Sequence, residues 1–130
     1  MNSETEELQL YEEVHPRLKV QRYEEEHWDN AIRQYREIEK RFWKEENQLV
    51  IDRLKATQFP VGAYHQPFVH VLDIARDGAV LPHIDSVRYC GSTISGISLL
   101  SDAVMRLVHA KDKQLMIDLY LKRRSVYTIT

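Results

Sequence analysis

LPHIDSVRYCGSTISGISLLSDAVMRLVH, residues 81–109, is the stretch that decides how the fold is interpreted. Near its start lie a histidine and an acid, His83 and Asp85, and the sequence that follows is rich in β-branched and apolar residues. Side chains at positions i and i+2 of a β-strand leave the same face of the sheet. In a strand, both side chains could therefore reach one point, as two ligands of a 2-His-1-carboxylate iron site do.

The composition predicts one domain without a membrane span. A chain of 130 residues is too short for two ordinary domains. Its hydrophobic content of 43% is enough for a core, and 29% charged residues indicate a soluble protein. No apolar run approaches the roughly 20 residues that a membrane helix needs. The single cysteine, Cys90, excludes an internal disulfide and is typical of a reducing compartment.

The charge is unevenly spread but forms no basic stripe. Residues 1–60 contain 10 Lys and Arg against 14 Asp and Glu, whereas residues 61–130 contain 8 against 6. A nucleic-acid-binding surface usually carries many cations that neutralise phosphates. The dense basic patch at 122–124 is more typical of a solvated hairpin turn, so the charge disfavours duplex DNA as a partner. The acidic N-terminus, residues 1–13, also differs from an Arg-rich, acid-poor mitochondrial presequence.

The N-terminal residues predict a short helix. Ser3 and Glu6 have the spacing of a capping box, which marks the start of a helix. The helix is expected to end at His15-Pro16, because a residue that precedes proline avoids the α region. The side chains expected on one side of this helix are Leu8, Tyr11 and Val14.

Two further segments of the first half have helical patterns. The charged segment from residue 23 to residue 42 has Trp28, Ile32 and Tyr35 at helical spacing, although a strand or loop over residues 22–28 remains an alternative. Another helix is predicted over residues 42–55, and the sequence Phe59-Pro60-Val61-Gly62 ends it. Its inward-facing side chains are expected to be Trp43, Val50 and Leu54.

The second half predicts an antiparallel sheet. The predicted strands cover residues 69–74, 80–85, 92–100, 104–109, 115–121 and 126–130. Asp77-Gly78 predicts a hairpin turn between the first two, and the 92–100 and 104–109 strands join near Ser101-Asp102. Residues 115–121 alternate as a half-buried strand does, and residues 122–125 form the turn before the last strand. The predicted fold class is therefore α+β, with helices in residues 1–60 and antiparallel strands in residues 61–130.

The His-x-Asp pair is a weak signal by itself. With 6 histidines and 20 acids in 130 residues, chance alone gives about one such pair. A second pair, His27 and Asp29, lies in the predicted helix, where positions i and i+2 do not share a face. His109 is the one histidine placed to be a third ligand, although a surface histidine at a strand end is the commoner explanation. The strand context therefore favours His83 and Asp85 as the candidate metal ligands.

An ordered set of motifs resembles a known family. The motifs are Tyr23–Asp29 (YEEEHWD), Arg36–Lys40 (REIEK), Val69–Asp73 (VHVLD), Pro82–Ser86 (PHIDS), Ser98–Ser101 (SLLS) and Val104–His109 (VMRLVH). Together they resemble the mitochondrial branch of the AlkB-like dioxygenases. The resemblance covers nearly the whole chain, so its specificity comes from the ordered set and not from the His-x-Asp pair.

The resemblance implies a double-stranded β-helix, or squashed jelly roll, that uses iron(II), 2-oxoglutarate and oxygen. His83 and Asp85 match the first two iron ligands, and Tyr127 matches a tyrosine that contacts 2-oxoglutarate. His109 matches a histidine outside the metal triad, and the second His-x-Asp pair belongs to the scaffold. The resemblance also implies a mitochondrial location and links to fatty-acid metabolism and programmed necrosis. It leaves a protein or an RNA substrate open.

The resemblance further implies an incomplete domain. The family's second histidine ligand and its 2-oxoglutarate-binding arginine are expected beyond Thr130, and the family usually has glycine at the turn position of Arg124. We therefore expect a partial jelly roll with open sheet edges and exposed apolar residues. Two hypotheses follow: an oxygenase represented by an incomplete, inactive chain, or a non-catalytic binding or regulatory form without a working iron site.

Overall fold

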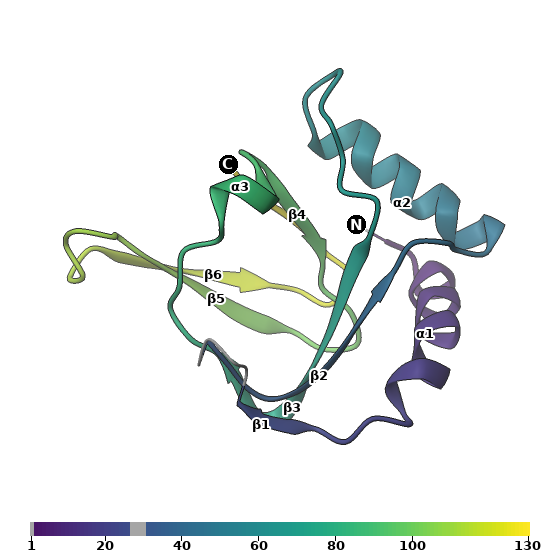
Figure 1. The fold of residues 1–130 in the computed structure, drawn as a ribbon, viewed down its shortest axis with the longest axis horizontal. Helices are drawn as coiled ribbons and strands as arrows, with labels where there is room; N and C mark the ends of the chain where they lie inside the picture. The colour runs from purple at the N-terminus through teal and green to yellow at the C-terminus, as the bar shows by residue number, and fades with distance from the viewer. Residues whose placement is uncertain (1, 27–30) are drawn as a thin grey trace.

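The computed structural model describes residues 2–26 and 31–130 (Figure 1). Within these ranges the elements are α1 (Glu4–Leu18), β1 (Glu24–Glu26), β2 (Ile32–Lys40), α2 (Glu45–Gln58), β3 (Val69–Val80), α3 (Val87–Cys90), β4 (Ile94–Ile97), β5 (Ala103–Val108), β6 (Met116–Leu121) and β7 (Val126–Ile129). The strands form small antiparallel sheets with the orders β1-β2-β3, β4-β7 and β5-β6. Helices together with small antiparallel sheets confirm the α+β class, but strands β1 and β2 lie between α1 and α2, so the predicted division into a helical first half and a stranded second half was wrong. None of the described helices is both long and apolar enough to cross a membrane.

Helix α1 begins at the predicted capping box but extends past its proline. The Ser3 hydroxyl accepts from the Glu6 N–H at 3.1 Å, and the Glu6 carboxylate accepts from the Ser3 N–H at 3.0 Å. The predicted end at His15-Pro16 was wrong, because Pro16 lies in the last turn and removes only one helical hydrogen bond there. The side chains buried on this helix are Glu7, Leu10, Val14 and Leu18, whereas Leu8, which was expected on the same side as Val14, is exposed.

The helix predicted over residues 23–42 was wrong, because this segment forms strands β1 and β2. Tyr35 and Ile38 are both buried, and their spacing of three looks helical. They lie in a stretch of β2 with uninterrupted pairing to β3, so their side chains leave opposite faces of the sheet. The helix prediction rested on Trp28, Ile32 and Tyr35; Trp28 lies outside the described residues, and the other two belong to β2. The alternative of a strand within residues 22–28 is confirmed by β1.

Strand β3 is continuous through the predicted hairpin turn. Arg33 pairs with Ala79 and Tyr35 pairs with Ile74, so residues 75–78 of β3 stand opposite the single residue Gln34. A side chain at Gly78 would collide with the backbone carbonyls of Arg33 and Gln34. Asp77-Gly78 therefore forms a bulge instead of a turn, and the predicted return strand over residues 80–85 was wrong.

The strands predicted in the last third of the chain are present. Strand β4 pairs with β7, with Gly96 opposite Tyr127, and β5 pairs with β6. The strands that join near Ser101-Asp102 therefore do not pair with each other. Arg124, in the predicted turn before β7, has a φ angle of 67°. Glycine adopts this left-handed conformation most readily, which agrees with the glycine that the resemblance implies there.

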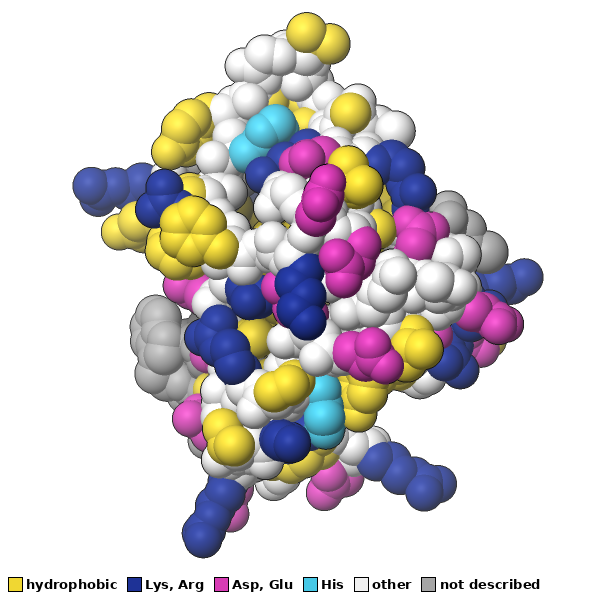
Figure 2. Space-filling model, turned by 90° about the vertical axis from the view of Figure 1, so that its right-hand side faces the viewer, with side chains coloured by type: hydrophobic (Ala, Val, Ile, Leu, Met, Phe, Trp, Pro, Cys, Tyr) yellow, Lys and Arg dark blue, Asp and Glu magenta, His cyan; other side chains and the backbone are white. Residues whose placement is uncertain are grey.

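The core lies in the first half of the chain. The buried hydrophobic residues are Leu10, Val14, Leu18, Ala31, Tyr35, Ile38, Val50 and Ile51. Trp43 packs against the cluster of Val14, Leu18 and Ile38, as the inward orientation predicted for it requires. Helix α2 starts three residues later than predicted and ends at Gln58, next to the expected breaker. Figure 1 shows α1 and α2 together on one side of the molecule. On that side, basic and acidic side chains are intermingled (Figure 2).

The apolar residues of the β5–β6 hairpin are mostly uncovered. Cross-strand pairs on one face of this hairpin are Ala103 with Leu121, Met105 with Leu119, and Leu107 with Ile117. We call these six residues the hairpin face. Ile117 is 56% exposed and Leu119 is 38% exposed, although the alternating pattern predicted a half-buried strand. The prediction of a strand is therefore confirmed, but the predicted burial was wrong.

Candidate metal and cosubstrate site

His83 and Asp85 lie in an irregular segment between β3 and α3. The segment starts where the Leu81 N–H donates to the Ala31 carbonyl at 2.6 Å, at the end of β3. Although this segment is not the predicted strand, His83 Nε2 lies 3.1 Å from Asp85 Oδ1. The two side chains are 39% and 45% exposed, so an ion or small molecule can reach them from solvent.

A backbone contact orients the His83 ring. Its Nδ1 atom lies 2.8 Å from the Leu81 carbonyl oxygen, which can only accept a hydrogen bond. Nδ1 therefore carries the proton, and in neutral imidazole the Nε2 lone pair faces the Asp85 carboxylate. Two acceptors at this distance repel each other unless a proton or a cation is shared between them. Histidines that bind metals usually have this kind of second hydrogen bond from the other ring nitrogen.

The distance between the two donor atoms fits a shared metal ion. Ligand atoms about 2.1 Å from a metal and at a right angle lie about 3 Å apart. The measured separation of Nε2 and Oδ1 is 3.1 Å. One imidazole nitrogen and one carboxylate oxygen are also the donor types of non-haem iron(II) sites. His83 and Asp85 therefore fit two neighbouring positions around such an ion.

The charge of Asp85 affects the Tyr127 phenol. Burial raises the pKa of the Tyr127 phenol, and the negative charge of Asp85 raises that pKa further. Tyr127 belongs to β7, and its ring lies against Gly96 of β4. Its hydroxyl makes no hydrogen bond to any other residue that the structure describes. The phenol is therefore half-buried and able to donate to a bound ligand.

The other candidate ligands do not join this pair. His109 Nδ1 accepts from the N–H groups of Lys111 and Asp112 at 3.1 and 3.0 Å, which gives this histidine a role in the turn after β5. His27 and Asp29 lie outside the described residues. Among residues 2–26 and 31–130, no group of three or more His, Cys, Asp or Glu side chains is arranged to hold a metal ion.

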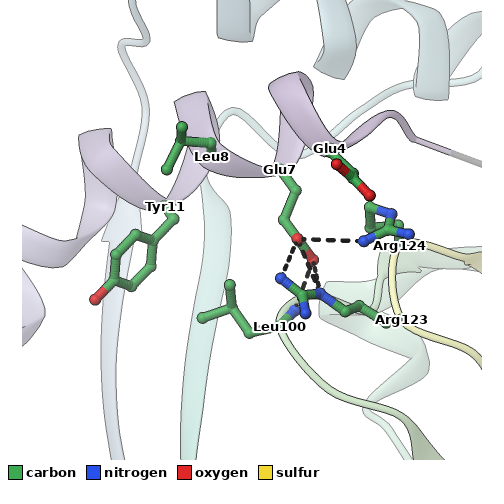
Figure 3. A pocket seen from close by; sticks show the side chains of 7 residues that line it. All are labelled: Glu4, Glu7, Leu8, Tyr11, Leu100, Arg123 and Arg124. Atoms are coloured by element: carbon green, nitrogen blue, oxygen red, sulfur yellow. Dashed lines mark hydrogen bonds and ion pairs between the residues drawn. The ribbon is translucent and has the colours of Figure 1, made fainter.

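An ion pair between a buried carboxylate and an exposed guanidinium, which sequence reasoning missed, joins the two ends of the chain. Figure 3 shows Glu7 of α1 facing Arg123 and Arg124, beside a pocket of about 300 Å³. The Arg123 guanidinium donates to the Glu7 carboxylate at 2.7 to 3.0 Å, and the Leu100 N–H donates at 2.8 Å. We call this arrangement the Glu7 clamp. Glu7 and Arg123 are separated by 116 in sequence number, so no local pattern could indicate their contact.

Hydrogen bonds keep Glu7 charged in the clamp. Donation by Arg123 is the main cause that lowers the pKa of Glu7, and the Leu100 N–H and the Arg124 charge lower it further. Burial acts in the opposite direction, but the donors outweigh it. Because the carboxylate is only 4% exposed and already has its partners, the Glu7 clamp is structural and not a site for an incoming ligand.

Comparison with known proteins finds relatives of nearly the whole chain. No sequence model of a protein family matches it. The chain is, however, similar over almost its whole length to two AlkB-type dioxygenases, which confirms the resemblance seen in its motifs. It is 44% identical over 128 residues to alpha-ketoglutarate-dependent dioxygenase alkB homolog 7, mitochondrial, of Mus musculus, and 43% identical over 127 residues to the Bos taurus protein of the same name. Each match covers 98% of this chain and 58% of the relative.

Proposed function

We propose that this chain carries part of the active site of an iron(II)- and 2-oxoglutarate-dependent oxygenase. The observation that carries the proposal is the pair of donor atoms on His83 and Asp85, 3.1 Å apart, with the His83 ring oriented by Leu81. Both relatives are named as alpha-ketoglutarate-dependent dioxygenases, which supports the same chemistry. Since the chain spans 58% of their length, the activity of the whole protein is part of the proposal.

Each candidate residue has a distinct role in this proposal. His83 and Asp85 would hold iron(II), and the Leu81 carbonyl keeps the His83 Nε2 lone pair available for it. The Tyr127 hydroxyl would donate a hydrogen bond to a carboxylate of 2-oxoglutarate. When bound, the metal and the cosubstrate supply the oxygen activation that oxidises a substrate C–H bond. The protein residues fix the positions of the ligands.

The finer aspects of the resemblance belong to the same proposal. The antiparallel pairs β4–β7 and β5–β6 are compatible with part of a double-stranded β-helix. A mitochondrial location is proposed from the names of the two relatives. Roles in fatty-acid metabolism and programmed necrosis rest on the resemblance alone. The charge of −2 and the intermingled charges in Figure 2 disfavour duplex DNA as a substrate. The resemblance leaves a protein or an RNA substrate open.

The proposal is tested by anaerobic titration of the chain with iron(II), with and without 2-oxoglutarate. We expect one bound iron in the wild type and a loss of most of the affinity in His83→Ala. His109→Ala is the matched control, because this histidine serves the turn after β5, and it should bind iron as the wild type does. Equal binding by His83→Ala and the wild type would contradict the proposed site.

Succinate release then separates the two hypotheses. We expect succinate from 2-oxoglutarate when the protein extends past Thr130 and is loaded with iron(II) in air, and none from its His83→Ala variant. That result supports the oxygenase. A folded 130-residue chain that binds no iron(II) supports the non-catalytic form without a working iron site. Stoichiometric iron(II) bound at His83 and Asp85 rejects that form.

A further inference from the structure

The ring of Tyr127 occupies the space where a side chain at Gly96 would stand. The two residues are directly opposite in the β4–β7 pair. A Cβ atom built on Gly96 would lie 2.5 Å from both the Cζ and the hydroxyl oxygen of Tyr127, and 2.7 Å from its Cε1. Real Cβ atoms do not approach other heavy atoms so closely. The phenol therefore lies across β4, over the Cα atom of Gly96.

The backbone does not explain the glycine at this position. Gly62 and Gly91 have φ angles of 79° and 65°, which disfavour other residues, but both have open space beside them. Gly96 shows the reverse combination, since it has a backbone conformation open to other residues and no space for a side chain. Glycine inside a strand normally weakens it and often marks a close approach of another group. Here the approaching group is the Tyr127 phenol.

The position of the ring decides where the hydroxyl acts. Because the clash would involve Cζ and the hydroxyl oxygen, a side chain at position 96 must displace the functional end of Tyr127. That end is within the electrostatic influence of Asp85 and has no hydrogen-bond partner among the described residues. We propose that Gly96 is a positioning residue, which fixes the position of the Tyr127 hydroxyl by leaving room for the ring over β4. The role toward 2-oxoglutarate rests on the proposed function, but the position of the ring does not.

The position of the ring is tested first, without metal or cosubstrate. A proton that lies over an aromatic ring has its NMR resonance shifted upfield, so a Gly96 Hα resonance should be shifted in the wild type. Tyr127→Leu should remove the shift, and NOEs between the Tyr127 ring and Gly96 should be lost with it. A Gly96 Hα resonance that is the same in the wild type and in Tyr127→Leu would overturn the proposal.

The consequence for binding is tested with a double-mutant cycle. With iron(II) or manganese(II) present, Gly96→Ala and Tyr127→Phe should each weaken 2-oxoglutarate binding about tenfold, as expected for one lost hydrogen bond to a carboxylate. The double variant should bind no more weakly than either single variant, because both remove the same contact. Gly91→Ala is the control for a glycine replaced in open space, and it should bind as the wild type does. Wild-type affinity in Gly96→Ala, or additive losses in the double variant, would overturn the proposal.

Two further outcomes are informative. If the wild type binds no 2-oxoglutarate, the proposed function fails, and the NMR result alone decides the role of Gly96. If Gly96→Ala does not fold, Gly96→Ala combined with Tyr127→Leu should fold again, because the displaced ring is gone. Failure of that combination to fold would contradict a specific clash with Tyr127.

Discussion

The α1–β2–α2 region and the β5–β6 hairpin use apolar residues in opposite ways. In the first region, Val14, Leu18 and Ile38 form a buried cluster. Among the described residues, every buried hydrophobic side chain lies between positions 10 and 51. The hairpin face is as apolar in sequence, yet Ile117 is 56% exposed. The difference shows that an alternating pattern specifies a strand and its apolar face, whereas burial needs a second element to cover that face.

Charged residues also differ in burial between two parts of the molecule. Glu7, in the well-packed region, is buried and has all its partners in the Glu7 clamp. His83 and Asp85 lie in an irregular segment and remain open to solvent. A buried carboxylate is tolerated only when donors surround it, so Glu7 has no capacity left for a ligand. The exposed pair makes few contacts of its own and is therefore the better candidate for binding.

The contrast in burial predicts unequal effects of one substitution at two sites. Ile38→Ala should lower the free energy of unfolding by about 2–5 kcal/mol, because it removes apolar volume from the buried cluster. Ile117→Ala is the matched control, and it should cost less than about 1 kcal/mol because its side chain is already largely solvated. Urea denaturation of both variants measures the difference. Similar losses would mean that the hairpin face is covered in solution.

The Glu7 clamp predicts a pH-dependent effect. Glu7→Gln should lower the free energy of unfolding by about 1–2 kcal/mol at neutral pH, since the donors of Arg123 and Leu100 lose a charged acceptor. The folded chain lowers the pKa of Glu7 from 4.5, so this stabilisation is present above pH 4.5 and is lost as the pH falls through the lowered pKa. Urea denaturation at a series of pH values should show the wild type and the variant converging in acid.

The control for this prediction is Glu12→Gln. Glu12 is an exposed acid of the same helix, so its substitution should leave both the stability and its pH dependence nearly unchanged. A constant difference between the wild type and Glu7→Gln from neutral to strongly acidic pH would contradict a charged Glu7 as the source of the stabilisation.

Local signals predicted some elements and misled on others. The capping box of α1 and the last three strands could be predicted, because their patterns are determined by neighbouring residues. Strand β2 could not be predicted, since Ile32 and Tyr35 have the spacing of a helix although both lie in the strand. Asp77-Gly78 was assigned to a turn because its bulge depends on Gln34, more than 40 positions earlier.

The candidate site also combines features that a local pattern predicts with features that depend on distant segments. The sequence predicted that His83 and Asp85 share a site because it placed them in a strand, which they do not form. The two side chains still meet, with the His83 ring held by the Leu81 carbonyl. Tyr127 entered only through the resemblance, because the chain offers no local signal that β7 lies near Asp85. Gly96 and the Glu7 clamp depend on pairings between distant segments, which no pattern in one sequence reveals.

The smallest expected effect concerns the turn that connects β6 to β7. Arg124 has a left-handed φ of 67°, which costs a residue with a side chain more than it costs glycine. Arg124→Gly should therefore raise the free energy of unfolding by about 0.5 kcal/mol, after the higher entropy of the unfolded glycine is included. Arg124→Ala keeps the strain and loses the 3.7 Å ion pair with Glu7, so it isolates the contribution of the side chain. Urea denaturation should find the Arg124→Gly variant more stable than the Arg124→Ala variant, because only alanine is strained at this φ angle. An alanine variant as stable as the glycine variant, or more stable, would contradict strain at the left-handed φ of position 124.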